Sequence, residues 1–290
     1  MKFFLILSLF LVSISAFSQP KIDIISETKG LSIRGLSVVD NQIFWVSGTN
    51  GTVGKSIDGG ATIEWFTVKG FEKSDFRDIE AFDKNTATIL SIGEPAYLLK
   101  TLNGGKNWKI VYENHKKRMF LDAMSFYHNQ KGIVIGDAIE GKIFLAVSND
   151  SGSSWTEKLD SPIAKGQEGC FASSGTNILI RKNDYYFVTG GKNSRFFKNE
   201  KASEIPIIQG KESTGANSIA ISKNGKNIII VGGDFNQKNE SLDNCLISKN
   251  GGKSFSKSVK NPTGYRSCVE FINRKTAISC GLNGVDISFD

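Results

Sequence analysis

The chain has 290 residues, of which 39% are hydrophobic and 22% charged, and its formal net charge is +7 at pH 7. This length suits one large all-β domain or two ordinary domains. The basic residues are spread along the chain, with one tight cluster at Lys116, Lys117 and Arg118, so the charge pattern argues against a nucleic-acid-binding surface.

The first residues have the features of a secretory signal peptide. Lys2 supplies a short positive region, and an apolar stretch runs from Phe3 to Phe17. Ala16 and Ser18 place small residues at both positions that a signal peptidase reads. We therefore expect residues 1–18 to be removed by cleavage near Ser18–Gln19, leaving 19–290 as a single domain. The apolar stretch is too short for a membrane span. The mature protein is expected to be secreted or periplasmic.

Segments of strand-like composition follow one another in sets of four. The expected strands are 32–39, 43–48, 53–56 and 63–68; then 76–82, 86–92, 97–101 and 107–112; then 120–127, 132–136, 144–148 and 155–159. A fourth set begins near Gly169 and covers 178–180, 186–189 and 195–198. A fifth set covers 218–222, 227–232, 245–248 and 255–259, and a sixth begins at Tyr265 with three strands. No segment has a sustained helical apolar period, so we expect very little helix.

Four turns repeat one pattern, a hydroxyl residue followed by Asp or Asn, a glycine and then an aromatic residue, known as an Asp box. Asp58, Asn103 and Asp150 are 45 and 47 residues apart. The side chains can bond the backbone of the turn itself, and glycine tolerates positive φ there. We assign these turns a structural role. Their residues are Ser56, Asp58 and Gly60; Thr101, Asn103, Gly105 and Trp108; Ser148, Asp150, Gly152 and Trp155; and Ser248, Asn250, Gly252 and Phe255.

Four short strands every 40 to 50 residues is the spacing of β-propeller blades. The fold class expected is therefore all-β, a propeller of four-stranded blades. Because strands are missing from the last set, we expect a seven-bladed ring whose last blade is incomplete in this chain, as in a C-terminally truncated protein. Residues 22–25 are expected to supply an outer strand to the last blade.

The candidate ligand-binding residues cluster at the starts of the innermost strands, which line the mouth of the channel. These are Arg34, Arg77, Asp78, Asp122, Glu168 and Arg266, joined by Glu94, Asp137 and Asp234 on loops after second strands. Two interpretations stay open. The charges can form ion pairs that hold blade to blade, or the arginines can clamp an anionic or polyhydroxylated ligand.

An enzymatic alternative is a sialidase-like glycoside hydrolase. In that alternative Arg34, Arg77 and Arg266 grip a substrate carboxylate, while Asp122 and Glu168 act as the acid/base pair. The two histidines, His115 and His128, lie in expected loops and give no support to a histidine triad or a metal centre. No phosphate-binding glycine motif is present. We expect no cofactor and no metal.

Two of the four cysteines fall opposite each other in one expected hairpin. Cys268 and Cys280 pair if the turn centres on Arg274. In an exported protein they can form a disulfide, or they can stay as two small buried thiols. The other two cysteines, Cys170 and Cys245, have no partner at C-x-x-C spacing.

Taken together, several short motifs resemble the exported BNR/Asp-box repeat proteins related to photosystem II stability and assembly factors. The motifs are Phe76-Arg77-Asp78-Ile79, Gly93-Glu94-Pro95-Ala96, Phe120-Leu121-Asp122-Ala123, Gly136-Asp137, Gly166-Gln167-Glu168-Gly169, Phe171-Ala172-Ser173-Ser174-Gly175-Thr176, Gly232-Gly233-Asp234-Phe235 and Tyr265-Arg266-Ser267. The chain departs from the usual pattern at Ala138, Glu140, Cys170 and Cys268. The resemblance implies a seven-bladed propeller, and family members generally lack a defined reaction.

We therefore expect a non-catalytic, monomeric propeller that acts outside the cytoplasm as a binding or assembly platform for a protein or glycan partner. No nucleic-acid partner and no membrane span are expected. The glycoside hydrolase remains the alternative function.

Overall fold

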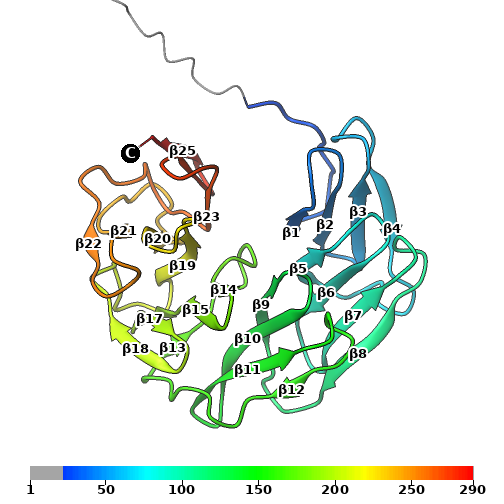
Figure 1. The fold of residues 1–290 in the computed structure, drawn as a ribbon, viewed down its shortest axis with the longest axis horizontal. Helices are drawn as coiled ribbons and strands as arrows, with labels where there is room; N and C mark the ends of the chain where they lie inside the picture. The colour runs from blue at the N-terminus through cyan, green and yellow to red at the C-terminus, as the bar shows by residue number, and fades with distance from the viewer. Residues whose placement is uncertain (1–21, 290) are drawn as a thin grey trace, which may run out of the picture.

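A computed structural model of the chain describes residues 22–289, which contain twenty-five strands and no helix. The strands form six sheets arranged around a common axis, as blades of a propeller (Figure 1). The expected signal peptide, residues 1–18, lies outside the described residues. The prediction of an all-β propeller with very little helix is confirmed for the described part of the chain.

The first three blades are four-stranded antiparallel meanders, in which each strand pairs with the next along the chain. Blade 1 contains β1 (Ile33–Val38), β2 (Phe44–Gly48), β3 (Thr52–Ser56) and β4 (Glu64–Thr67). Blade 2 contains β5 (Phe76–Ala81), β6 (Ala87–Ser91), β7 (Ala96–Thr101) and β8 (Lys109–Asn114). Blade 3 contains β9 (Leu121–Tyr127), β10 (Lys131–Ile139), β11 (Lys142–Ser148) and β12 (Thr156–Glu157).

The later blades are less regular. Blade 4 contains β14 (Ile178–Arg181), β15 (Asp184–Val188), β17 (Arg195–Lys198) and β18 (Lys201–Glu204). Blade 5 contains β19 (Thr214–Ile221), β20 (Ile228–Asp234), β21 (Cys245–Ser248) and β22 (Ser256–Lys257), and its sheet is extended by β13 (Glu168–Gly169) and β16 (Gly190–Gly191). Blade 6 contains β23 (Cys268–Phe271), β24 (Ala277–Gly281) and β25 (Gly284–Ser288).

The expectation of seven blades is wrong, because the described residues form six sheets. The interval between Asp boxes measures the length of chain in one blade, and it carries no information on the number of blades in the ring. Residues 22–25 form no strand on the last blade. The side chain of Ile25 lies instead beside Gly60 in the Asp box of blade 1. Blades 1 and 6 are the two ends of the arc of sheets (Figure 1).

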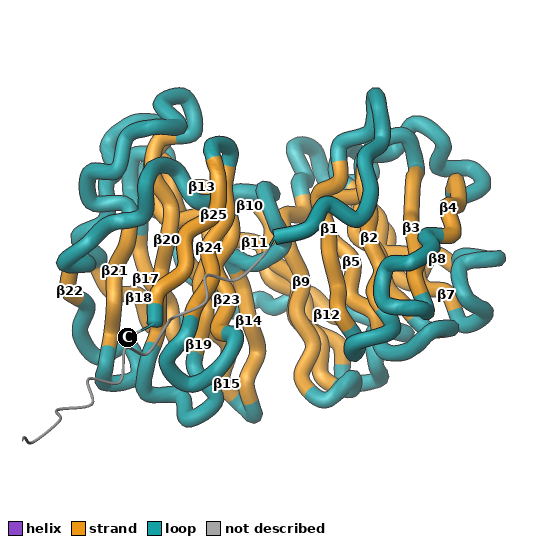
Figure 2. Tube along the Cα trace, turned by 90° about the horizontal axis from the view of Figure 1, so that it is seen from above, coloured by secondary structure: helices purple, strands orange, loops and turns teal. Residues whose placement is uncertain are grey.

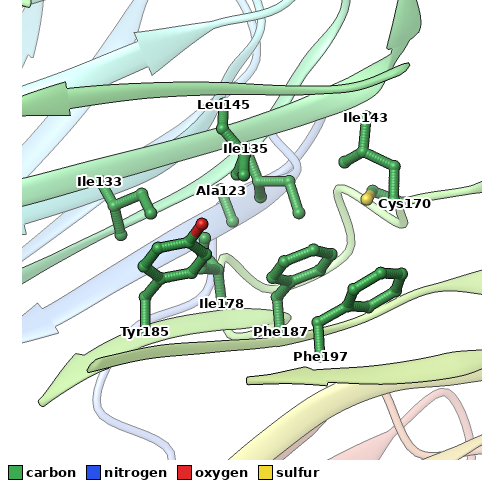
Figure 3. Close-up of a cluster of buried hydrophobic side chains, with 10 residues drawn as sticks. All are labelled: Ala123, Ile133, Ile135, Ile143, Leu145, Cys170, Ile178, Tyr185, Phe187 and Phe197. Atoms are coloured by element: carbon green, nitrogen blue, oxygen red, sulfur yellow. The ribbon is translucent and has the colours of Figure 1, made fainter. Parts of the chain in front are cut away.

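The core of the molecule lies between neighbouring sheets, because alternate residues of each strand face opposite sides of a blade. The cluster between blades 3 and 4 is typical, with aliphatic side chains of blade 3 packed on aromatic side chains of blade 4 (Figure 3). The rings of Phe187 and Phe197 stack with centroids 4.2 Å apart. The buried members are Ala123, Ile133, Ile135, Ile143, Leu145, Cys170, Ile178, Tyr185, Phe187 and Phe197.

Hydrogen bonds between inner strands tie successive blades together. In each case a polar side chain on one inner strand accepts from a backbone N–H of the next, so that a buried amide beyond the ladder is satisfied. The pairs are Ala81 N to Ser37 Oγ at 2.9 Å, Met124 N to Asp78 Oδ2 at 2.7 Å, Ile180 N to Ser125 Oγ at 3.2 Å and Val269 N to Ser218 Oγ at 3.0 Å.

The four Asp boxes share one geometry and connect the third and fourth strands of blades 1, 2, 3 and 5. In blade 3, Ser148 Oγ donates to Asp150 Oδ1 at 2.8 Å and accepts from Gly152 N at 2.8 Å, while Asp150 accepts from Ser154 N at 2.9 Å. Figure 2 shows the loops gathered at the two rims of the arc, with the strands running between them. The turns lie in the outer half of each blade, away from the inner strands.

Candidate functional site

Most inner strands carry a β-bulge near their start. The register between β1 and β2 shifts between Ile33 and Gly35, and the register between β5 and β6 shifts between Phe76 and Asp78. Arg34 and Arg77 are therefore the extra residues. A bulge leaves one residue outside the ladder and re-aims its side chain. The shifts in blades 3 and 5 do the same for Asp122 and Asn217.

Three of the bulged residues lie around a loop, residues 171–177, that precedes β14. Arg77 and Asn217 contact this loop directly, and Arg34 lies near Tyr265, which bonds Asn217. Arg77 Nη1 donates to the Ala172 carbonyl at 3.4 Å, and Ser173 Oγ donates to Asn217 Oδ1 at 3.2 Å. Ser174 Oγ donates to the carbonyl of Ser267 at 2.6 Å. The loop thus joins blade 4 to blades 2, 5 and 6 and occupies the centre of the fold. We call the surface around it the channel mouth, defined by Arg34, Arg77, Phe171, Phe235 and Tyr265.

Two arginines on neighbouring blades bring positive charge to the channel mouth. Arg77 is held by Asp75, which accepts from Nε at 2.9 Å and pairs with Nη2 at 2.8 Å. Arg34 has no such partner: its Nε is buried and makes no hydrogen bond within residues 22–289. Because Arg34 forms no ion pair among these residues, its positive charge is not neutralised locally and can attract an anionic ligand to the mouth.

Aromatic rings from three blades stand beside these arginines. Phe171 lies 5.8 Å from Phe235, and Phe235 lies 6.4 Å from Tyr265, measured between ring centroids. Tyr265 is buried and donates to Asn217 Oδ1 at 2.8 Å. Burial raises the pKa of Tyr265, and the positive charge of Arg34 opposes that rise. Phe235 is 40% exposed, so an aromatic face is open to solvent at the mouth.

Asp122 is fully buried, and its carboxylate oxygens make no hydrogen bond of good geometry among the described residues, although the backbone N–H of Ala172 lies close enough to oppose the rise in its pKa. Burial raises the pKa of Asp122 well above its ordinary value, the neighbouring Asp137 adds to the rise, and Arg77 opposes it. Asp137 accepts from Cys170 N at 3.1 Å, and burial raises its pKa too. Because both pKa values are raised, at least one of the two carboxyl groups, Asp122 or Asp137, is expected to be protonated beneath the loop.

The second proposed catalytic carboxylate, Glu168, is fully engaged elsewhere. Arg195 Nε donates to its Oε1 at 2.8 Å and Arg195 Nη2 to its Oε2 at 2.5 Å. Thr189 Oγ1 and the backbone N–H of Lys165 donate to the same carboxylate at 2.5 and 2.7 Å. The side chain of Glu168 is completely buried. It is an ion-pair partner within the protein, and its contacts leave no room for proton transfer to a substrate.

Arg266 is engaged in the same way. Its Nε donates to Asp286 Oδ2 at 2.6 Å, its Nη1 donates to Asn283 Oδ1 at 2.6 Å, and its Nη2 also pairs with Asp286. Nη1 donates further to its neighbour's carbonyl, and Nη2 to Thr263 Oγ1. Arg266 is fully buried. It organises blade 6 and offers no free donor to a ligand.

The other candidate residues make structural contacts. Asp78 accepts from the backbone N–H groups of Met124 and Ile79. Glu94 accepts from Arg118 N, and Asp234 accepts from Asn236 N at 3.0 Å and pairs with Lys211 at 3.4 Å. The structure therefore brings Arg34, Arg77 and Asp122 together near the loop, and places Glu168, Arg266, Glu94 and Asp234 in local networks.

The aromatic part of the site was missed by sequence reasoning, although Phe171, Phe235 and Tyr265 all stand in the motifs of the resemblance. Their position beside the bulges is the signal that could have identified them. No group of three or more His, Cys, Asp or Glu side chains in residues 22–289 is arranged to hold a metal ion. None of the described segments forms a helix long and apolar enough to cross a membrane.

Comparison with solved structures supports the propeller architecture. The chain is similar to the β-propeller domain of Cps50 (Swd1) from Myceliophteria thermophila, with 12% identity, coverage of 89% of this chain and 83% of that chain, and a TM-score of 0.58. It is also similar to an ancestral GH74 enzyme, with 14% identity, coverage of 85% and 34%, and a TM-score of 0.57. At such low sequence identity, structural similarity supports only the class of fold, which is an all-β propeller.

The family relation comes from the sequence. Residues 22–117, which contain blades 1 and 2, match the family described as photosynthesis system II assembly factor YCF48. A solved structure described as YCF48 bound to D1 peptide shares 16% identity, with coverage of 89% of this chain and 93% of that chain and a TM-score of 0.48. No curated protein matches the chain. The chain is a BNR-type propeller related to photosystem II assembly factors, so the resemblance found in the motifs is confirmed.

Proposed function

We propose that this chain is a non-catalytic platform, acting outside the cytoplasm, that binds a protein partner at the channel mouth. The observation that carries the proposal is that the channel mouth holds both Arg34, an arginine without an ion-pair partner among the described residues, and an exposed aromatic ring, Phe235. Arginine and aromatic side chains dominate the binding energy of protein interfaces. The family relation of residues 22–117 points the same way, since that family is one of assembly factors.

The partner segment best suited to this mouth is acidic. Arg34 and Arg77 stand at equivalent bulges of neighbouring blades, and guanidinium groups bind carboxylates with directional, charge-assisted hydrogen bonds. Burial screens Asp122 from such a segment, and the raised pKa of its carboxyl group favours the neutral form. Its charge therefore does not oppose an anionic ligand.

The glycoside hydrolase alternative has less support. It requires two carboxyl groups free to exchange protons with a substrate, and Glu168 is enclosed by Arg195, Thr189 and Lys165 N. The similarity to a GH74 enzyme concerns the fold alone. Chromogenic glycosides offered to the wild-type protein and to Asp122→Asn distinguish the two functions, because turnover lost in the variant would establish the hydrolase.

The binding proposal is tested with an array of synthetic peptides that pairs acidic sequences with their amide counterparts. The wild-type protein is expected to retain acidic peptides that contain an aromatic residue. Arg34→Ala with Arg77→Ala is expected to lose them, and Arg274→Ala, a change at an exposed arginine in the β23–β24 turn, is expected to keep them. Equal binding by all three proteins would overturn the proposed site.

A further inference from the structure

The turn that ends each inner strand lies at one rim of the molecule, next to the Asp box of the same blade. A backbone N–H of each Asp box donates to a carbonyl of that turn. The pairs are Gly59 N to Gln42 O at 2.9 Å, Gly104 N to Asn85 O at 2.9 Å, Ser151 N to Gln130 O at 2.9 Å and Gly251 N to Lys226 O at 2.8 Å. Because the inner strands start at the channel mouth and end at these turns, this rim lies opposite the mouth (Figure 2). We call it the turn rim.

The part of the turn rim that belongs to blades 5 and 6 is strongly basic. It consists of three turns, residues 222–227, 248–254 and 272–276, which contain no Asp or Glu. Their cationic side chains are all exposed, and none forms an ion pair with another described residue. These side chains are Lys223, Lys226, Lys249, Lys253, Arg274 and Lys275. We call the three turns the basic turns.

The same rim has a different character on the other blades. The carboxylates in the corresponding turns of blades 1 to 3 are Asp40, Asp58, Asp83 and Asp150. In blade 4, Lys198 is paired with Asp184 at 3.0 Å. Basic residues are spread along the sequence, so their concentration on the rim of blades 5 and 6 is produced by the fold.

A groove of about 420 Å³ lies between two of the basic turns, at the junction of blades 5 and 6. Charged and aliphatic side chains line it together: Lys223, Arg274, Glu270, Ile221, Phe271 and Ile272. Ile272 is 61% exposed. Glu270 is the single carboxylate in the lining, and its Oε1 accepts from Phe271 N at 2.9 Å. An exposed aliphatic side chain thus stands among cations that outnumber the one carboxylate beside them.

We propose that the basic turns bind the surface of an anionic lipid bilayer, with Ile272 inserted among the lipid headgroups. Clusters of this many Lys and Arg residues attract anionic lipids, and apolar side chains buried at the headgroup boundary add to the binding. Single-stranded nucleic acids are bound by aromatic side chains on which bases stack, and the basic turns contain no aromatic residue. The exposed aliphatic side chain therefore favours a lipid surface. The proposal does not depend on the proposed function, and the bound orientation leaves the channel mouth facing away from the bilayer.

The test is sedimentation of the protein with vesicles of phosphatidylcholine alone and of an equimolar mixture of phosphatidylcholine and phosphatidylglycerol. We expect binding to the mixed vesicles only, and weaker binding as salt is added, because salt screens exposed charges. Lys223→Glu with Arg274→Glu is expected to weaken binding at least about tenfold.

The matched control is Lys84→Glu with Lys106→Glu, which makes the same change of net charge at two exposed lysines of blade 2 on the turn rim. This control is expected to bind the mixed vesicles as the wild-type protein does. An equal loss of binding in both double variants, or equal binding of the wild-type protein to phosphatidylcholine alone, would overturn the proposal.

The insertion of Ile272 is tested separately. Ile272→Ser is expected to weaken vesicle binding by roughly threefold or more, whereas Leu282→Ser, at a 60% exposed leucine in the β24–β25 turn, is expected to leave it unchanged. Full binding by Ile272→Ser would contradict the insertion.

Heparin and duplex DNA serve as soluble polyanions in the same assay. Binding to either of them without binding to mixed vesicles would assign the basic turns to a soluble polyanion and overturn the lipid proposal. Arg34→Ala with Arg77→Ala should leave vesicle binding unchanged, so that failure here is distinguishable from failure at the channel mouth.

Discussion

The buried pair of Glu168 and Arg195 shows how a charged residue can have a role that the sequence does not reveal. Arg195 lies 27 positions further along the chain, and its guanidinium also packs over the ring of Phe197 at 4.7 Å. The carboxylate and the guanidinium are both desolvated, so each depends on the other for compensation.

Removing one partner of this pair should be costly. Glu168→Gln leaves the Arg195 charge buried without its counter-ion, and we expect the free energy of unfolding to fall by about 3–5 kcal/mol. The matched control is Glu204→Gln, which breaks an exposed pair with Lys165 and should change it by at most about 1 kcal/mol. Urea unfolding of both variants measures the difference. Equal destabilisation would show that Glu168 and Arg195 do not form a desolvated pair.

The stability of the protein is expected to depend on pH through the carboxyl group of Glu80. Burial raises the pKa of Glu80 to about 8 from an ordinary value of 4.5, and a hydrogen bond from Ser37 opposes the rise. Between these two values the unfolded chain loses a proton that the folded chain keeps, so stability falls as pH rises through that window. Burial also raises the pKa of neighbouring Asp78, which acts with the same sign.

We therefore expect Glu80→Gln to become more stable relative to wild type as pH rises from 5 to 8. One proton accounts for at most about 1.4 kcal/mol per pH unit. The measurement is the free energy of unfolding in urea at several pH values. A constant difference between the two proteins across this range would show that Glu80 titrates normally in the folded state.

At the scale of the strands, periodicity and turn chemistry carried most of the prediction. The Asp boxes and alternating apolar residues placed the strands of blades 1 to 3 to within a few residues, because both signals are local. The hairpin of β23 and β24 has the predicted register, with Cys268 opposite Cys280. The bulges at Arg34 and Arg77 could not be predicted, because they depend on how each inner strand meets its neighbour.

The hairpin of β23 and β24 also makes a chemical prediction. The two thiols are free in the structure, and the hydrogen bond from Cys268 lowers the pKa of Cys280 to about 7. A thiolate at Cys280 can attack oxidised glutathione, which forms a mixed disulfide and releases one molecule of reduced glutathione; attack by Cys268 on that mixed disulfide then closes the protein disulfide and releases the second. We expect intact mass to fall by two hydrogens, with Cys170 and Cys245 unmodified. A stable glutathione adduct, or no loss of mass, would contradict the pairing.

For the whole molecule, the number of blades and the site were beyond the reach of local signals. The resemblance implied seven blades, and the described chain forms an arc of six sheets bridged at its centre by loop 171–177 (Figure 1). The candidate charges were chosen by their place at the strand starts, and position alone does not separate Arg34, with an unused donor, from Arg266, whose donors are all engaged. Only the three-dimensional structure shows which hydrogen-bond partners surround each arginine.

The claim that a protein partner binds at the channel mouth is tested most directly by site-specific photocrosslinking. The protein is produced with p-benzoylphenylalanine in place of Phe235, at the mouth, or in place of Val259, on the outer rim, and irradiated in its native extract. We predict a discrete crosslinked partner from position 235 that disappears when Arg34 and Arg77 are replaced by alanine. A partner captured equally at position 259, or unaffected by loss of the arginines, would contradict binding at this mouth.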